Sequence, residues 1–191
     1  MEVHKNLNCI RAESEEDWRK WLEKNYDSDQ SVWLIIYKKD SKVASVYYSE
    51  AVDQALCFGW IDSVPNKRDA ESYYVLFSKR NPKSNWSQVN KNKIARLEKL
   101  GLIHESGRRM IELAKESGTW NALEKVDALE EPEDLMNLLN ASPTALANWQ
   151  TLSKSYRRGV LEWLQGAKKS ETRSKRLIQI VERLEEKKRI I

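Results

Sequence analysis

The hydrophobic pattern of this 191-residue chain changes near residue 86. Before that point, short apolar runs rich in β-branched and aromatic residues, such as Val32–Tyr37 and Tyr73–Phe77, are typical of strands. After it, apolar residues recur at helical spacing, first at Trp86, Val89, Ile94 and Leu97. The pattern predicts an α+β protein. We expect a small N-terminal α/β half (1–85) with a short, mostly antiparallel sheet, and an all-helical C-terminal half (86–191), packed as one unit.

Local signals place the other elements. Ser14 precedes three acidic residues and is expected to cap a helix. We predict further strands at Val46–Tyr48 and Trp60–Val64, a short helix capped by Ser49 between them, and a frayed terminus around His4. In the C-terminal half, helices are expected to begin near Trp86, Ser106, Pro132, Pro143 and Ser153, with a last one carrying Leu177 to Leu184.

The sequence lacks the signatures of several protein classes. Cys9 and Cys57 have no metal-ligand spacing, which favours a reduced protein, and no P-loop, dinucleotide, hydrolase or zinc motif is present. We therefore expect no cofactor and no metal, and we favour a non-catalytic role. The N-terminus lacks an apolar signal core, and no run approaches the ~20 apolar residues of a membrane span, so we expect a cytoplasmic protein without membrane insertion.

Cys57 is predicted to be structural. It lies one turn before the end of the predicted short helix, where the helix dipole disfavours a thiolate. We expect a buried and unreactive thiol.

The stretch Ser78–Asn90, reading SKRNPKSNWSQVN, gathers cations and polar side chains between a strand and a helix start. The first N–H groups of a helix lack internal partners and favour anions. We therefore predict an anion site in which backbone amides after Ser84 complete a cradle formed by Arg80, Lys83, Ser84, Asn85 and Trp86. The alternative is a solvated turn in which Ser84 caps the following helix.

Other residues could contribute to this site. Asp62, in an apolar run, either pairs with a nearby cation or faces a ligand, and Trp60 could form an aromatic wall. A second basic stretch, Ala167–Arg173, could bring Lys168 and Arg173 to the first, or could be ordinary surface charge.

Several motifs resemble a known family. Glu50–Ser63 (EAVDQALCFGWIDS), Ser78–Asn90, Ala114–Trp120 (AKESGTW) and Ala167–Leu177 (AKKSETRSKRL) look like the bacteriocin-protection, YdeI or OmpD-associated proteins, with a resemblance running from about Trp18 to Leu184. The resemblance implies a bacterial protein with a role in protection against bacteriocins or cationic peptides. The name of the family alone implies association with a porin, and the resemblance implies no catalytic residue for this chain.

Three functional hypotheses follow. The first is a cytoplasmic stress-resistance protein that binds a small anionic ligand through the residues above. The second is nucleic-acid binding. Basic segments support it: Lys67–Lys99 holds nine Lys/Arg and three Asp/Glu, and Lys154–Arg189 holds twelve and five. The segment between them, Glu105–Asp134, has nine acidic residues against four basic ones, and the net charge of the whole chain is only +4. Both observations argue against a long phosphate track. The third is an enzyme of unknown reaction using Asp62 and a lysine.

Overall fold

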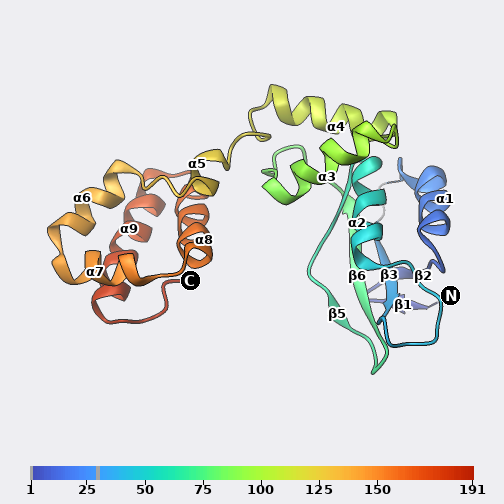
Figure 1. The fold of residues 1–191 in the computed structure, drawn as a ribbon, viewed down its shortest axis with the longest axis horizontal. Coiled ribbons are helices and arrows are strands. Elements are labelled where there is room, and N and C mark those ends of the chain that lie inside the picture. Colours follow the sequence, from blue (N-terminus) through green and yellow to red (C-terminus); the bar gives the residue numbers. More distant parts are fainter. Residues whose placement is uncertain (1, 29–30) are drawn as a thin grey trace. The chain divides into compact units, whose positions relative to one another are not determined.

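The computed structural model describes residues 2–28 and 31–191, and the chain divides into two compact units. We call Met1–Asn121 unit 1 and Ala122–Ile191 unit 2. Unit 1 combines a sheet with helices and unit 2 is helical, so the α+β prediction is confirmed. In the described part of the chain the last strand ends at Lys79, as the change of pattern predicted (Figure 1).

Unit 1 is built on a mixed six-stranded sheet. Its elements in chain order are β1 (Val3–His4), β2 (Leu7–Arg11), α1 (Glu15–Asn25), β3 (Val32–Tyr37), α2 (Tyr48–Cys57), β4 (Trp60–Asp62), β5 (Asn66–Lys67), β6 (Ser72–Lys79), α3 (Gln88–Lys99) and α4 (Glu105–Glu116). The strand order is β1-β2-β3-β6-β4, with β5 also paired to β6. The described strand pairs are antiparallel except β2 with β3, which run parallel.

Both faces of the central strand β3 are buried. Because side chains alternate along a strand, Leu34 and Ile36 point to one face and Trp33 and Ile35 to the other. The first face packs against Trp18 and Leu22 of α1 and the apolar side of α2. The second face forms a smaller cluster with Cys9 and Tyr74. This double burial explains why the run reads as continuously apolar.

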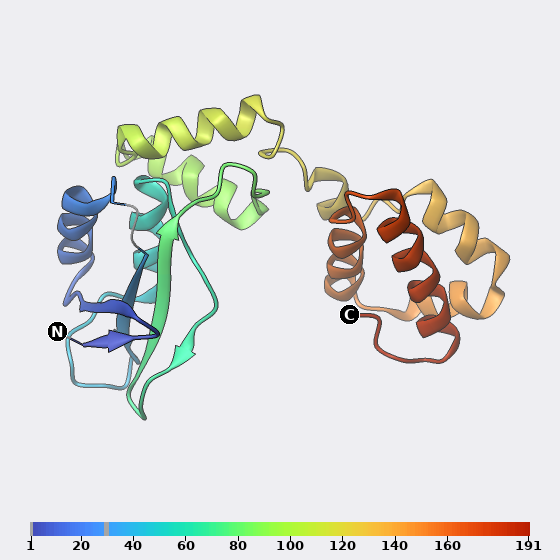
Figure 2. The ribbon, with the colours of Figure 1, turned by 180° about the vertical axis from the view of Figure 1, so that it is seen from behind.

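Helices α3 and α4 belong to the same core as the sheet. Trp86, Ile94, Leu97 and Ile111 lie in one cluster with the residues of α1 and α2, and Figure 2 shows both helices beside the upper end of α2. For this reason unit 1 continues to Asn121, whereas we expected a division at residues 85 and 86. Helical pattern alone could not reveal that these two helices complete the sheet-containing core.

A close backbone contact joins α2 to α4. A Cβ atom at Gly107 would lie 2.1 Å from the carbonyl oxygen of Cys57, so only glycine fits at this crossing. The Cys57 oxygen also accepts the His104 N–H at 3.0 Å, and Ser106 Oγ donates to the Phe58 carbonyl at 3.0 Å. The start of α4 therefore satisfies carbonyls that the end of α2 leaves open. Cys57 is fully buried here, as predicted, and its lack of reactivity stays a prediction.

Three local predictions were wrong. Val46–Tyr48 is not a strand, because Tyr48 begins α2. Ser49 is not the cap of this helix, because it lies inside it. The Glu50 carboxylate accepts the Tyr47 N–H at 3.0 Å, which is one of the two hydrogen bonds of a capping box. The terminus around His4 is not frayed, because β1 and β2 form a hairpin whose turn residues Lys5 and Asn6 have positive φ.

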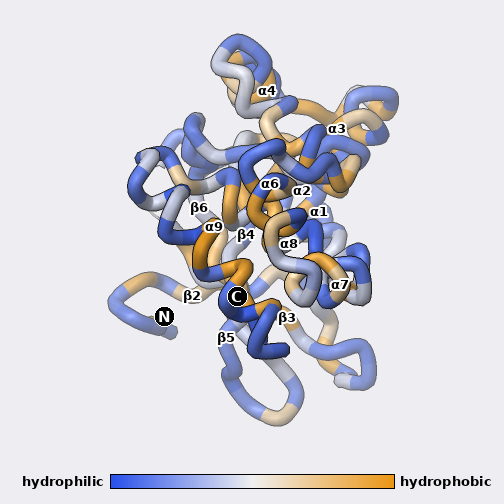
Figure 3. The backbone as a smooth tube through the Cα atoms, turned by 90° about the vertical axis from the view of Figure 1, so that its left-hand side faces the viewer, coloured by the Kyte–Doolittle hydropathy of each residue, from blue (hydrophilic) through white to orange (hydrophobic). Residues whose placement is uncertain are grey.

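Unit 2 is a bundle of helices. They are α5 (Glu124–Asp127), α6 (Glu133–Ala141), α7 (Pro143–Thr151), α8 (Lys154–Gln165) and α9 (Ser170–Glu185). Figure 3 shows hydrophobic and hydrophilic stretches alternating along the helices, as expected for helices with one inward face. The inward residues include Leu139, Trp149, Leu164 and Ile180, which form the core of this unit. The predicted starts at Ser142-Pro143 and Ser153 are confirmed, with both serine side chains capping.

Candidate functional site

Arg80 is the most unusual of the predicted site residues. It directly follows β6, its side chain is only 5 % exposed, and its N–H donates to the Gly59 carbonyl at 2.9 Å. Other arginines in both units have carboxylate partners, for example Arg68 with Glu2 and Arg173 with Asp134. Within the described residues Arg80 has no ion pair. A buried cation without a partner is costly, and burial lowers the pKa of Arg80 to about 10, with the charge of Asp62 acting in the opposite direction.

The guanidinium of Arg80 is held by an aromatic ring and a carbonyl. Its central carbon lies 4.0 Å from the centre of the Trp86 ring, a cation–π contact. Nη2 donates to the Asn85 carbonyl at 2.5 Å. The buried Nε has no hydrogen-bond partner in the described part of the protein. The group is therefore fixed in position while part of its donor capacity is unused.

The loop that follows Arg80 is a compact turn. The Asn81 side chain accepts the Lys83 N–H at 2.9 Å, and both the N–H and the hydroxyl of Ser84 donate to the Asn81 carbonyl. Ser84 therefore does not cap α3; that role belongs to Ser87, whose hydroxyl accepts the Asn90 N–H at 3.3 Å.

One amide of the predicted cradle is bonded within the chain. The Trp86 N–H after Ser84 donates to the Thr119 carbonyl at 3.2 Å, so it is not available to a ligand. The exposed Lys83 ammonium makes no ion pair with a described residue. The side chains of Arg80 and Lys83 are the charged donors that this loop offers to an anion.

A second segment completes this surface. Trp120 packs on Trp86 with ring centres 4.9 Å apart, and Thr119 contacts the loop through its backbone and side chain. The ammonium groups of Lys91 and Lys115 lie 5.6 Å and 5.5 Å from the Trp120 ring centre. Thus Ser78–Asn90 and Ala114–Trp120, two motifs distant in sequence, meet in an aromatic pair surrounded by cations. Lys115 was not among the predicted site residues, although it lies in the AKESGTW motif.

The remaining predicted residues lie elsewhere. Trp60 is 1 % exposed and donates to the Tyr26 carbonyl at 3.0 Å, so it is a core residue and not an aromatic wall. Asp62 accepts the Tyr48 hydroxyl at 2.5 Å and forms no ion pair with Arg80. That contact raises the pKa of Tyr48, after the larger effect of burial.

The second basic stretch belongs to unit 2. Arg173 donates two hydrogen bonds, of 2.6 Å and 2.9 Å, to the Asp134 carboxylate, so its charge is compensated within that unit. The same contact lowers the pKa of Asp134. Lys168 is exposed on the segment before α9. Arg173 is thus a structural residue that ties α9 to α6.

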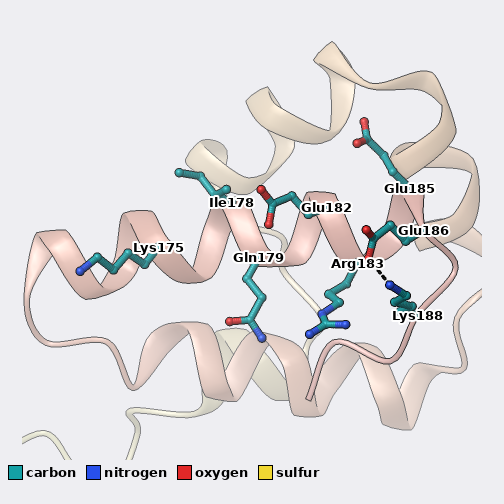
Figure 4. Close-up of a pocket in the computed structure, with 8 residues that line it drawn as sticks. All are labelled: Lys175, Ile178, Gln179, Glu182, Arg183, Glu185, Glu186 and Lys188. Carbon is teal, nitrogen blue, oxygen red and sulfur yellow. Dashed lines mark ion pairs between the residues drawn. The ribbon is translucent and has the colours of Figure 1, made fainter.

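A hollow of about 780 Å³ lies along α9 in unit 2 (Figure 4). Charged side chains dominate its lining, and the figure marks the ion pair between Lys188 and Glu186, with an N–O distance of 3.1 Å. Lys175 pairs with Glu171 of its own helix at 2.7 Å. Exposed pairs of this kind are ordinary surface features, so the hollow does not have the character of a built site.

The described residues contain no group of His, Cys, Asp and Glu side chains close enough to hold a metal ion. None of the helices in the described ranges is long and apolar enough to cross a membrane.

Residues 10–110 match a family described as a domain of unknown function, DUF8412. The chain belongs to this family. Residues 128–187 match the family described as bacteriocin-protection, YdeI or OmpD-associated, which confirms the resemblance over that segment. The resemblance was expected to extend back to Trp18, but the motifs around Cys57 and Arg80 lie within the DUF8412 match. No curated protein and no solved structure matches the chain.

Proposed function

We propose that this protein is a binding protein and that unit 1 holds a small oxyanion at Arg80. The observation that carries the proposal is the buried guanidinium without a carboxylate partner among the described residues, with Nε unbonded. Ion pairing would normally compensate such a charge, and a bound phosphate, sulfate or carboxylate would do so here.

The surroundings favour an anion over a cation or an apolar ligand. Lys115 adds positive charge beside Trp120, and Lys83 adds another on the exposed turn between Arg80 and Trp86. The Asn81 turn contains Pro82 and three internal hydrogen bonds, so little ordering entropy is lost on binding. The family matched by residues 128–187 names bacteriocin protection, and we propose that anion binding in unit 1 serves a protective, non-catalytic role in the cytoplasm.

The test is the stabilisation of the protein by phosphate or sulfate. Melting temperatures are compared at constant ionic strength, with sodium chloride replacing the oxyanion salt in the reference. A ligand at 100 times its Kd stabilises the folded state by about 2.7 kcal/mol. We expect the wild type to gain stability with phosphate, Arg80→Met to lose this gain, and Lys83→Gln to show a smaller gain.

Arg176→Met is the matched control. Arg176 also stacks on a tryptophan, with its guanidinium carbon 4.6 Å from the Trp163 ring centre, and it also donates to a backbone carbonyl. The control should keep the full phosphate response. The proposal is overturned if the wild type ignores phosphate and sulfate, or if Arg80→Met responds as the wild type does. Because methionine replaces an unpaired buried charge by an apolar chain, this variant should fold.

A further inference from the structure

Unit 1 has a cavity of its own, which lies where the end of α2 meets the start of α4. Its volume is about 550 Å³, within the ~300–1,000 Å³ range of small-molecule sites. Tyr26, Phe58, Gly59, His104, Arg109 and Met110 are among the residues that line it. In Figure 1 the two helix ends lie together at the top of this unit. Its lining does not include the Arg80 loop.

Aromatic rings form one wall of this cavity. The His104 ring stacks on Phe58 with centres 4.9 Å apart and lies 4.7 Å from the Tyr26 ring centre. Met110 adds a polarisable side chain, which packs well against aromatic rings. This lining suits a flat, apolar ligand body.

Two groups in the lining can donate hydrogen bonds to a ligand. Nδ1 of His104 faces its own chain, because it lies 3.2 Å from the Ser106 backbone nitrogen and 2.9 Å from Ser106 Oγ. The tautomer in which Nδ1 accepts the Ser106 N–H leaves Nε2 as the donor. Nε2 has no partner in the described part of the chain, and the exposed Arg109 guanidinium has neither an ion pair nor a hydrogen bond there. Donors without acceptors on their own chain favour a ligand with acceptor oxygens.

The walls are held rigidly in place. Gly107 brings α4 against the Cys57 carbonyl, and Ser106 Oγ bonds the Phe58 carbonyl at 3.0 Å. Gly59 adopts a φ of +77°, and a Cβ there would lie 3.2 Å from the Ser106 oxygen. A site whose shape is fixed before binding loses little entropy when a ligand arrives.

The charges around the cavity limit the class of ligand. Lys79 and Arg109 contribute two positive charges, while Asp27 and Glu105 contribute two negative ones. Lys79 is within 3.5 Å of the Asp27 carboxylate. A lining without net charge disfavours a polyphosphate but accepts one carboxylate beside Arg109.

We propose that this cavity binds a small aromatic carboxylate, with its ring against Phe58 and His104 and its carboxylate on Arg109 and the His104 Nε2–H. The site is separate from the oxyanion site at Arg80, and its ligand differs in carrying an aromatic ring.

The test uses the two histidines as reporters. The chain contains only His4 and His104. His4 lies on the other face of the sheet, stacked on Tyr74, so it reports unspecific changes. Benzoate and indole-3-acetate are titrated into the full-length protein at constant ionic strength and pH while the histidine ring signals are followed by NMR. We expect saturable shifts at His104 and none at His4.

Arg109→Gln and Arg108→Gln form a matched pair of variants. Both residues are exposed on α4, but Arg108 pairs with Glu98 at 3.3 Å and does not line the cavity. Arg109→Gln should weaken binding at least tenfold, whereas Arg108→Gln and Arg80→Met should bind as the wild type does. Cyclohexanecarboxylate should bind more weakly, because it lacks a flat ring.

Three outcomes would overturn the inference: no saturable His104 shift with either carboxylate, equal binding by Arg109→Gln, or equal competition by inorganic phosphate. Loss of binding in Arg80→Met would place the carboxylate at the Arg80 site, which would also contradict this inference while supporting the proposed function.

Discussion

At the scale of single residues, glycine is required at one position of unit 1 and is dispensable at one position of unit 2. A Cβ at Gly107 would lie 2.1 Å from the Cys57 oxygen, whereas a Cβ at Gly159 would meet only the end of the Ile191 side chain at 3.5 Å. Gly107→Ala must therefore push α4 away from α2, and we expect it to destabilise unit 1 by about 1–3 kcal/mol or more. Gly159→Ala should stabilise the protein by about 0.5–1 kcal/mol, because alanine loses less backbone entropy in a helix.

Urea unfolding of the two alanine variants measures both effects. Equal stability of Gly107→Ala and wild type would mean that the close crossing of α2 and α4 is absent in solution. The same crossing buries Cys57, and burial raises the pKa of its thiol to about 11. The sequence prediction rested on the helix dipole and did not include this cause.

At the scale of elements, the sequence predicted those whose signals are local. Val32–Tyr37 and the capped helices from Ser142 and Ser153 required only a buried apolar run or a hydroxyl next to a helical pattern. The predicted strand at Val46–Tyr48 was wrong because aromatic residues such as Tyr47 favour strands. The Glu50 side chain, three residues later, bonds the Tyr47 N–H and stabilises a helix start here. The hairpin turn at Lys5 and Asn6 lacks the usual glycine, so nothing local announced it.

The candidate site was predictable in part for the same reason. The cluster of Arg80 and Trp86 was visible in one stretch of sequence, and the structure brings them into contact. The approach of Trp120 and Lys115 depends on how α4 packs, and the pairing of Asp62 with Tyr48 depends on where α2 begins. Long-range packing decides both, and a single sequence does not reveal it.

A buried carboxylate links α2 to α3 and gives a prediction at this scale. Asp53 is 8 % exposed and accepts hydrogen bonds from Lys93, at 2.6 Å, and from Arg96. Asp53→Asn removes the charge at constant volume and leaves two cations facing each other. Because Arg96 is half exposed, we expect a loss of about 1–3 kcal/mol in the free energy of unfolding, less than for a fully buried pair.

Glu98→Gln is the control for Asp53→Asn. Glu98 pairs with Arg108, and both side chains are about half exposed. Such pairs contribute about 0–1 kcal/mol to the free energy of unfolding. Thermal denaturation at low and high salt compares the losses of stability in the two variants. Equal losses in the two variants would contradict the assignment of Asp53 as the link between α2 and α3.

At the scale of the whole molecule, family matches and packing agree on two parts. The match over residues 10–110 falls within unit 1, and the match over 128–187 falls within unit 2. The core clusters of unit 1 share no residue with the cluster of unit 2. Each unit therefore buries its own apolar surface, which is the physical requirement for folding alone.

The boundary at Asn121 can be tested with fragments. A fragment of residues 1–121 contains every residue of the sheet-containing core, including Trp86, Leu97 and Ile111, and at this size it buries enough surface to fold. A fragment of residues 1–85 ends at the boundary suggested by the hydrophobic pattern and lacks α3 and α4. Without them the parts of α2 that contact α3 and α4, including the fully buried Cys57 beside Gly107, would be exposed to water. We expect dispersed amide NMR signals and cooperative melting from fragment 1–121, and neither from fragment 1–85. Native-like spectra from the shorter fragment would show that α3 and α4 cover the core without being needed to form it, and an unfolded longer fragment would show that unit 1 depends on the residues after 121.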